Sequence, residues 1–405
     1  MYGAGLIEAL RRTLRFGQTG AAVPTQSGDA PVAPNSKTQL EFFGVGGEKM
    51  RATGCNIVVD AKELSVVGIT EILSHLLKIW GLFHKLIAEA DKRRPDLAIV
   101  IDSPAFNWRV ARQMKKHGIP VVYYVCPQFW AWRQGRVRLL RKYIDKALVI
   151  FPFEEKFYRD RGVNAEFVGH PLAGLPRPAI SRDEYAAEHG LDAAKPWITL
   201  MPGSRNKEVR MNLPEMLWAA EFLGTDYNFI LPVAPTVSKA LIQELMGWDD
   251  GATASIHLTT DALPALAHSR AGIIASGTAT VEAAMMETPF VMIYRVTRLT
   301  YLLGRWTVKV PHFAMVNLIA GEEVVPELVQ QDFTAEKVVA EVKQIILDGA
   351  PRQKMIEGLK RVKQLLGGNT DGSAPERAAR AIADLLQTRG AASRGESARA
   401  SIASN

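Results

Sequence analysis

Two short segments in the second half of the chain combine glycine, hydroxyl side chains and charge, a pattern suited to binding phosphate groups. The first comprises residues 202–205, PGSR, directly after an apolar run that ends at Met201. Glycine lets main-chain N–H groups approach a phosphate, serine donates a hydrogen bond to it, and arginine binds it with a charged fork. A turn with a surface arginine accounts for the same residues, so the segment is a candidate phosphate-binding loop.

The second segment comprises residues 276–282, SGTATVE, and also follows an apolar run. We expect a helix to begin within it, because Ser276 and Thr278 suit a helix start, where unpaired N–H groups and the helix dipole attract a diphosphate. One turn into that helix, Glu282 is placed to accept hydrogen bonds from ribose hydroxyls. Ordinary helix capping explains one such segment equally well, but two of them favour a nucleotide diphosphate site.

Asp102 is the candidate for acid–base chemistry. It follows the apolar run at residues 97–101, LAIVI, which predicts a buried strand. A carboxylate at the carboxyl end of such a strand would lie in a cleft between domains, where partial desolvation makes it more basic. It could then take a proton from an attacking hydroxyl group. Capping of the following helix is the competing interpretation.

The hydrophobic pattern around these residues alternates between strands and helices, which specifies parallel sheets covered by helices on both faces. We predict two Rossmann-like, doubly wound domains of the α/β class facing a cleft. In the first half we expect helices at 6–14, 72–93 and 109–117, and a further helix that ends at residue 161. We expect strands there at 41–45, 97–101, 121–125, 147–151 and 165–168. In the second half we expect strands at 197–200, 229–232, 256–258, 271–274 and 290–293.

Glycine- and proline-rich stretches mark the boundaries of these domains. Residues 169–180 are typical of a linker, which gives an N-terminal domain at 1–170 and a C-terminal domain at 171–388. His170 lies in this linker, where packing explains it better than catalysis. Residues 17–37 read as a flexible insertion, and residues 389–405 as a disordered tail.

The composition restricts the function further. With 405 residues, 47% hydrophobic and 22% charged, the chain suits two globular domains and neither a fibrous nor a disordered protein. It has no long uncharged apolar run and no secretory signal, so we expect a cytoplasmic protein. A net charge of +7 favours anionic partners, but Lys and Arg are dispersed and no nucleic-acid-binding module is recognisable. No Asp-x-Asp motif is present, so we expect no metal on the diphosphate.

The motifs, taken together and in order, resemble those of the lipid-A-disaccharide synthase family. The resemblance covers nearly everything from residue 41 to about 386. It is carried by VGG at 45–47, GC at 54–55, LSVVGITEI at 64–72, IDSPAFN at 101–107, YVCPQFWAWR at 124–133, PGSR at 202–205, SGTATVE at 276–282 and NLIAG at 317–321.

The resemblance implies a fold, a reaction and a site. Such enzymes have the GT-B fold and join UDP-2,3-diacylglucosamine to 2,3-diacylglucosamine 1-phosphate (lipid X), with release of UDP and inversion at the anomeric carbon. It implies Asp102 as the base, no cofactor and no metal, and it allows a homodimer. The implied UDP-sugar site comprises Gly203, Ser204, Arg205, Glu208, Ser276, Gly277, Thr278, Ala279, Glu282, Asn317, Gly321, Glu327 and Gln330.

Two segments combine apolar and basic residues in a way that suits a membrane surface. Residues 73–86 have a broad apolar face with Lys78 and Lys85, and residues 295–313 include Trp306 and Phe313 among several basic side chains. A core-facing helix with a basic rim explains either segment alone. Because diacylated substrates must leave a bilayer, we expect peripheral attachment to the cytoplasmic face of the inner membrane.

The chain departs from the family pattern at two places. Relatives have an apolar strand and a Gly-Glu-x-Ser-Gly-Asp loop before the segment that matches Tyr2-Gly3-Ala4-Gly5, so we expect a misassigned start and free strand edges in the N-terminal domain. Ala105 stands where relatives often carry a second carboxylate. Two alternatives therefore stay open: a non-catalytic nucleotide-sugar or lipid-binding protein that arose by N-terminal loss, and a UDP-sugar 2-epimerase.

Overall fold

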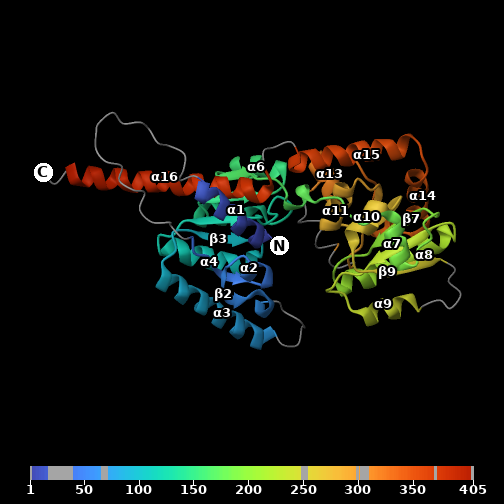
Figure 1. Cartoon of the computed structure of the whole chain (residues 1–405), viewed down its shortest axis with the longest axis horizontal. Helices are drawn as coiled ribbons and strands as arrows, with labels where there is room; N and C mark the ends of the chain where they lie inside the picture. Colours follow the sequence, from blue (N-terminus) through green and yellow to red (C-terminus); the bar gives the residue numbers. More distant parts are fainter. Residues whose placement is uncertain are drawn as a thin grey trace. The chain divides into compact units, whose positions relative to one another are not determined.

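The computed structural model describes residues 2–16, 40–64, 72–247, 254–297, 301, 310–368 and 372–402 (Figure 1). The chain divides into two compact units. The first unit comprises Met1–Phe129, Gly135–Pro171 and Asp371–Asn405, and the second comprises Trp130–Gln134 and Leu172–Thr370. The predicted insertion at residues 17–37 lies outside the described residues.

The first unit is built from parallel strands and helices. Its strands form a two-stranded sheet, β1 (Phe43–Gly46) with β2 (Asn56–Asp60), and a four-stranded sheet in the order β3 (Ala98–Ile101), β4 (Val121–Tyr124), β5 (Lys146–Val149), β6 (Ala165–Phe167). Its helices are α1 (Tyr2–Phe16), α2 (Glu48–Ala52), α3 (Ile72–Arg93), α4 (Pro104–Lys116), α5 (Val137–Tyr143), α6 (Pro152–Arg159) and α16 (Ala374–Ile402).

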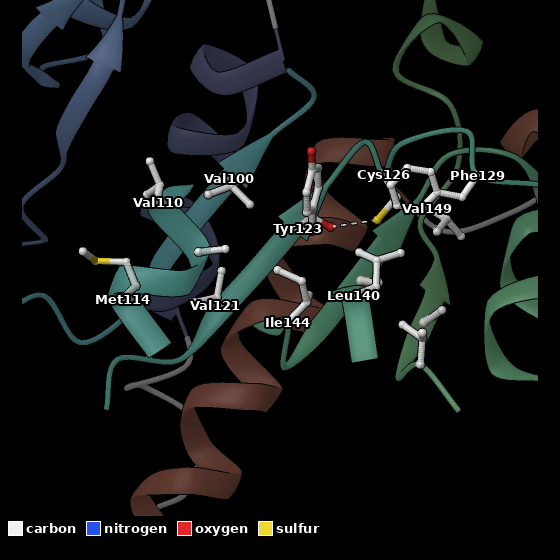
Figure 2. Packing of buried hydrophobic residues seen from close by; sticks show 14 of the residues in the cluster. Val100, Val110, Met114, Val121, Tyr123, Cys126, Phe129, Leu140, Ile144 and Val149 are labelled. Carbon is white, nitrogen blue, oxygen red and sulfur yellow. Dashed lines mark hydrogen bonds between the residues drawn. The ribbon is translucent and has the colours of Figure 1, made fainter. Parts of the chain in front are cut away.

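The core of the first unit surrounds strand β4. All four residues of β4 are buried, as expected for a central parallel strand covered on both faces. Figure 2 shows Val121 and Tyr123 of this strand among Val100, Val110 and other apolar side chains of the cluster. The Cys126 thiol, which follows the strand, donates to the main-chain carbonyl of Tyr123 (3.5 Å). The thiol thus links the loop back to the end of the strand by a weak hydrogen bond.

Four strand edges in this unit have no partner among the described strands, one each on β1, β2, β3 and β6. β1 pairs only with β2, and β3 pairs only with β4, so each presents one edge without main-chain hydrogen bonds to another strand. Every open sheet has two outer edges, so an edge freed by a missing first strand stays a prediction. The two sheets still share one core, because Val59 of β2 and Val100 of β3 belong to the same buried cluster.

The second unit contains one parallel six-stranded sheet. Its strand order is β12 (Glu327–Val329), β11 (Phe290–Tyr294), β10 (Ala271–Ala275), β7 (Trp197–Met201), β8 (Asn228–Pro232), β9 (Ser255–Thr259). Its helices are α7 (Arg182–His189), α8 (Asn206–Leu223), α9 (Lys239–Met246), α10 (Ala262–His268), α11 (Thr278–Met286), α13 (Met315–Ala320), α14 (Ala335–Ile346) and α15 (Ala350–Lys363). The five strands predicted in this half are confirmed, and β12 was not predicted.

The C-terminal region differs from the prediction in two ways. Residues 389–405 were expected to be disordered, whereas α16 continues to Ile402. The second domain was expected to reach residue 388, whereas residues from Asp371 belong to the first unit. The second difference arises because α16 packs along α1 (Figure 1), with an ion pair between Arg12 and Glu376 (3.2 Å).

Among the helices in the described ranges, none is both long enough and apolar enough to cross a bilayer.

Candidate functional site

The two candidate phosphate-binding segments follow neighbouring strands of the second unit. The chain passes from β7 to β8 and β9 on one side, and from β10 to β11 and β12 on the other. The order of the strands therefore reverses between β7 and β10, and ligands of open α/β sheets bind outside the carboxyl ends of the strands at such a point. Both segments lie at this position.

The segment after β7 forms a tight turn into helix α8. Gly203 has φ +128°, and a Cβ there would meet Glu208 at 2.7 Å, so glycine is required. Glu208 accepts a hydrogen bond from the Ser204 N–H (3.1 Å) and forms an ion pair with Arg205 (2.7 Å). Ser204 and Arg205 are exposed, which leaves them accessible to a ligand.

Two side chains outside the predicted set hold this turn in place. The Asn212 amide of α8 donates to the Pro202 carbonyl (2.8 Å), and the Thr236 hydroxyl donates to the Ser204 carbonyl (2.6 Å). The turn is therefore attached both to its own helix and to the connection between β8 and α9. Pattern reading missed these residues because their partners are main-chain groups distant in sequence.

The segment after β10 leads into the N-terminus of α11. Gly277 and Thr278 are exposed there, and the Thr280 hydroxyl donates to the Gly277 carbonyl (2.8 Å). Glu282 lies one turn further on, and burial raises the pKa of its carboxyl group. The N-terminus of α11, which is the positive end of the helix dipole, therefore lies at the reversal point. The half-buried Glu282 follows one turn into the helix.

A third segment, at residues 312–314, also reaches this end of the sheet and was missed as a site component. The Ser276 hydroxyl donates to the Phe313 carbonyl (2.8 Å), and the Phe313 ring stacks on Tyr294 at the end of β11 (5.9 Å between centroids). Burial and the nearby Glu208 carboxylate both raise the pKa of Tyr294. Phe313 therefore links the β10 segment to the end of β11, and Tyr294 lies close enough to Glu208 of the β7 segment to feel its charge.

Asn317 and Glu327 hold this third segment in place through hydrogen bonds. Asn317 is fully buried; its amide nitrogen donates to the Val325 carbonyl and Glu327, and its oxygen accepts from the Val324 and Val325 N–H groups. Glu327 also accepts the N–H groups of Phe313 and Ala314. These bonds give Asn317 a structural role, and its contact with a nucleotide stays a prediction.

The other two predicted residues of this region have unusual main-chain angles. Gly321 ends α13 with φ +73°, a conformation that favours glycine. Gln330 follows β12 with φ +55°, and its amide nitrogen is buried with no hydrogen-bond partner among the described residues. Because a buried donor without a partner is costly, Gln330 remains a candidate for ligand contact.

Asp102 lies in the first unit, at the turn between β3 and α4. It has φ +49° and is followed by Ser103 with φ +39°, so two consecutive residues other than glycine adopt the left-handed region. Each such residue costs about 1–3 kcal/mol and is typical of functional sites. Its side chain is exposed, and the partial desolvation expected in a cleft between the domains stays a prediction.

The surroundings of His170 and Arg295 bear on two further expectations from the sequence. His170 is buried against Phe151 (5.4 Å between ring centroids), and burial lowers its pKa to about 4, as suits a packed neutral histidine. Arg295 was read as part of a lipid-facing segment, but it pairs with Glu215 (3.1 Å) and lies over the Phe333 ring. Trp306 and its immediate neighbours lie outside the described residues.

Solved structures similar to this chain share its architecture. A glycosyltransferase of kitacinnamycin has a TM-score of 0.55 at 15% identity, with 93% of this chain and 94% of that chain covered. The UDP-GlcNAc 2-epimerase from Neisseria meningitidis, bound to UDP-GlcNAc, also has a TM-score of 0.55, at 11% identity, with 86% and 100% covered. At these identities the likeness shows the fold alone, which is the GT-B type.

Sequence comparisons identify the family. The family model described as lipid-A-disaccharide synthetase matches residues 30–382. The lipid-A-disaccharide synthase of Koribacter versatilis (strain Ellin345) is 49% identical over 389 residues, 96% of each chain. That of Acidobacterium capsulatum is 47% identical over 365 residues, 87% of this chain and 91% of the relative. The chain therefore belongs to the lipid-A-disaccharide synthase family.

Proposed function

We propose that this protein transfers a diacylglucosamine unit from UDP-2,3-diacylglucosamine to 2,3-diacylglucosamine 1-phosphate, forming the lipid A disaccharide 1-phosphate and UDP. The observation that carries the proposal is the meeting of two phosphate-type turns at the reversal point between β7 and β10. The second unit binds the UDP-sugar, and the first unit supplies the acceptor side.

The diphosphate is held without a metal ion. Arg205 provides a charged fork from one side of the reversal point, and the exposed N-terminus of α11 at Gly277 and Thr278 provides main-chain donors from the other. Fixed donors of this kind stabilise the charge that develops on UDP as it leaves. Activity is therefore expected to persist in excess EDTA, and its loss on chelation with recovery on added Mg²⁺ would refute this part.

Asp102 acts as the general base. Inversion requires one group to remove the proton of the acceptor hydroxyl while that oxygen attacks the face opposite UDP. An exposed carboxylate on a strained turn at the end of a parallel strand suits this role, because it is accessible and its direction is set by the main chain.

The test is UDP release from the diacylated donor and acceptor. We expect turnover that needs both lipids and falls at least a hundredfold in Asp102→Ala, with UDP affinity unchanged. Turnover of plain UDP-N-acetylglucosamine without acceptor would instead indicate an epimerase. UDP binding without any turnover of the lipids would indicate a non-catalytic binding protein.

The protein docks on anionic membrane through helix α3. Leu77 and Trp80 are 73% and 63% exposed on this helix, with Lys78 and Lys85 exposed beside them, while Phe83, Leu86 and Ile87 pack into the core. Apolar side chains with flanking cations suit the interface of an anionic bilayer. This supports peripheral attachment to the cytoplasmic face of the inner membrane.

Liposome sedimentation tests the attachment. We expect the protein to sediment with anionic vesicles at low salt, and the double variant Leu77→Ser/Trp80→Ser to lose most of this binding. The matched control is Trp218→Ser, which removes another exposed tryptophan (46%) from the second unit. Equal binding of all three proteins would refute a role of α3.

A further inference from the structure

The main chain at Asp102 is held by two side chains from the core of the first unit. The carbonyl oxygen of Asp102 accepts one hydrogen bond from the Tyr123 hydroxyl (2.7 Å) and one from the Asn107 amide (2.5 Å). The same Asn107 nitrogen also donates to the Ile101 carbonyl (2.9 Å). The end of β3 is thereby attached to β4 and to α4 at the residue where the turn begins.

The hydrogen bonds to the Asp102 carbonyl lie at the residues whose main-chain angles are strained. Asp102 and Ser103 both have positive φ, and such strain persists only where surrounding groups determine the conformation. A carbonyl with two donors has both lone pairs used, so rotation of the peptide unit would break both bonds together. The direction of the Asp102 side chain depends on that peptide unit.

Tyr123 is suited to this task by its position. Its side chain is fully buried, its ring packs against Trp108 (5.6 Å between centroids), and burial raises the pKa of its hydroxyl, which keeps the donor proton in place. The next residue, Tyr124, is equally buried but its hydroxyl has no hydrogen-bond partner among the described residues. The two neighbouring tyrosines therefore differ in whether the hydroxyl holds the Asp102 turn.

We propose that Tyr123 and Asn107 are positioning residues, which fix the left-handed turn at Asp102 and so hold its carboxylate in the direction needed to accept a proton. This inference rests on the proposed role of Asp102 as the base. Neither side chain takes part in the chemistry. Their effect is on the geometry of the base, and small misplacements of a base cost large factors in rate.

The first experiment compares Tyr123→Phe with Tyr124→Phe in the full chain. Each variant removes one buried hydroxyl, but only the first removes a bond to Asp102. We expect kcat of Tyr123→Phe to fall roughly tenfold with KM for both lipids within about twofold, and Tyr124→Phe to keep the wild-type kcat. Equal kcat in both variants would overturn the proposal.

A double-variant comparison separates positioning from general damage to the fold. If Tyr123 acts through the carboxylate, Tyr123→Phe has no further effect on kcat in the Asp102→Ala background, because the group that it directs is gone. A fall of the same factor in both backgrounds would show a merely structural role. If Asp102→Ala itself retains full kcat, the proposed base is wrong, which is a different failure.

Hydrogen–deuterium exchange gives a readout that does not depend on turnover. The Asp102 N–H donates to the Tyr124 carbonyl, and the Asn107 N–H to the Ser103 carbonyl. We expect the peptide covering residues 101–107 to exchange at least severalfold faster in Tyr123→Phe and in Asn107→Ala than in Tyr124→Phe. Unchanged exchange in both of the first two variants would refute the positioning role.

Discussion

Arg205 illustrates how a side chain can be paired and still be available to a ligand. Its ion pair with Glu208 leaves the Arg205 side chain 80% exposed, and pairs between exposed groups contribute only about 0–1 kcal/mol. In the proposed site, exchange of this partner for a doubly charged diphosphate would therefore cost little. Glu208 meanwhile keeps its hydrogen bond to the Ser204 N–H, so the turn retains its shape.

Arg205→Ala should weaken UDP binding with little effect on folding. A charge-assisted bond of this kind is worth about 1.5–3 kcal/mol, which corresponds to a rise in Kd of roughly ten- to a hundredfold, measured by calorimetry. Arg210→Ala is the control, because Arg210 lies on α8, the helix that follows Arg205, and pairs with Glu244 (2.8 Å) away from the turn. An equal loss of UDP affinity in Arg205→Ala and Arg210→Ala would point to a general effect of positive charge.

Glu282 should oppose stability while it assists binding. Burial raises the pKa of its carboxyl group in the folded protein, so the ionised form costs stability above that pKa, and the cost vanishes as the pH falls below the unfolded value of about 4. Glu282→Gln should therefore raise the melting temperature at pH 8, and not at pH 4, yet weaken UDP binding. A variant that melts lower at pH 8 would contradict this assignment.

At the scale of elements, α13 and β12 hold in place the segment at residues 312–314, which carries Phe313. Glu327 at the start of β12 caps the N–H groups of Phe313 and Ala314, and Asn317 of α13 ties Glu327 to the connection between the two elements. These hydrogen bonds thus fix the main chain at Phe313 beside the turn after β10. In the proposed site, this rigidity would limit the orientations open to a bound nucleotide.

Asn317→Ala should be strongly destabilising. It leaves two N–H groups, one carbonyl and part of Glu327 without partners in a buried place, and we expect a loss of about 2–4 kcal/mol in the free energy of unfolding by urea. Gln353→Ala, at an exposed position of α15, should change it by less than about 0.5 kcal/mol. Unchanged stability with lost UDP binding would instead support a direct nucleotide contact.

Elements built from long apolar runs were predictable, and contacts made across the fold were not. α3 was predicted with its observed bounds, and β7 and β10 stand out because buried parallel strands are continuous apolar runs. β12 has only three residues and no periodicity to detect. The partners of Asn317 and Tyr123 depend on which main-chain groups the fold brings near them, and no local pattern encodes that.

At the scale of the whole molecule, the two units have separate cores and should respond separately to damage. Leu6 of α1 and Leu245 of α9 are both buried, at 2% and 4% exposure, one in each unit.

Truncation of either side chain to alanine should cost about 2–5 kcal/mol. Leu6→Ala should lower the melting transition of the first unit, and Leu245→Ala that of the second, with UDP raising only the latter in calorimetry. A single transition that shifts equally in both variants would show that the units unfold as one.

The packing of α16 on α1 has a consequence for synthesis on the ribosome. The first unit needs residues from both ends of the chain, whereas nearly all of the second unit lies in the continuous stretch Leu172–Thr370. At about 5–20 residues per second, translation of that stretch takes about 10–40 s, during which α1 waits for its partner helix. The usual order is thus reversed: the unit translated first is completed last, and the apolar face of α1 is open to chaperones in the interval.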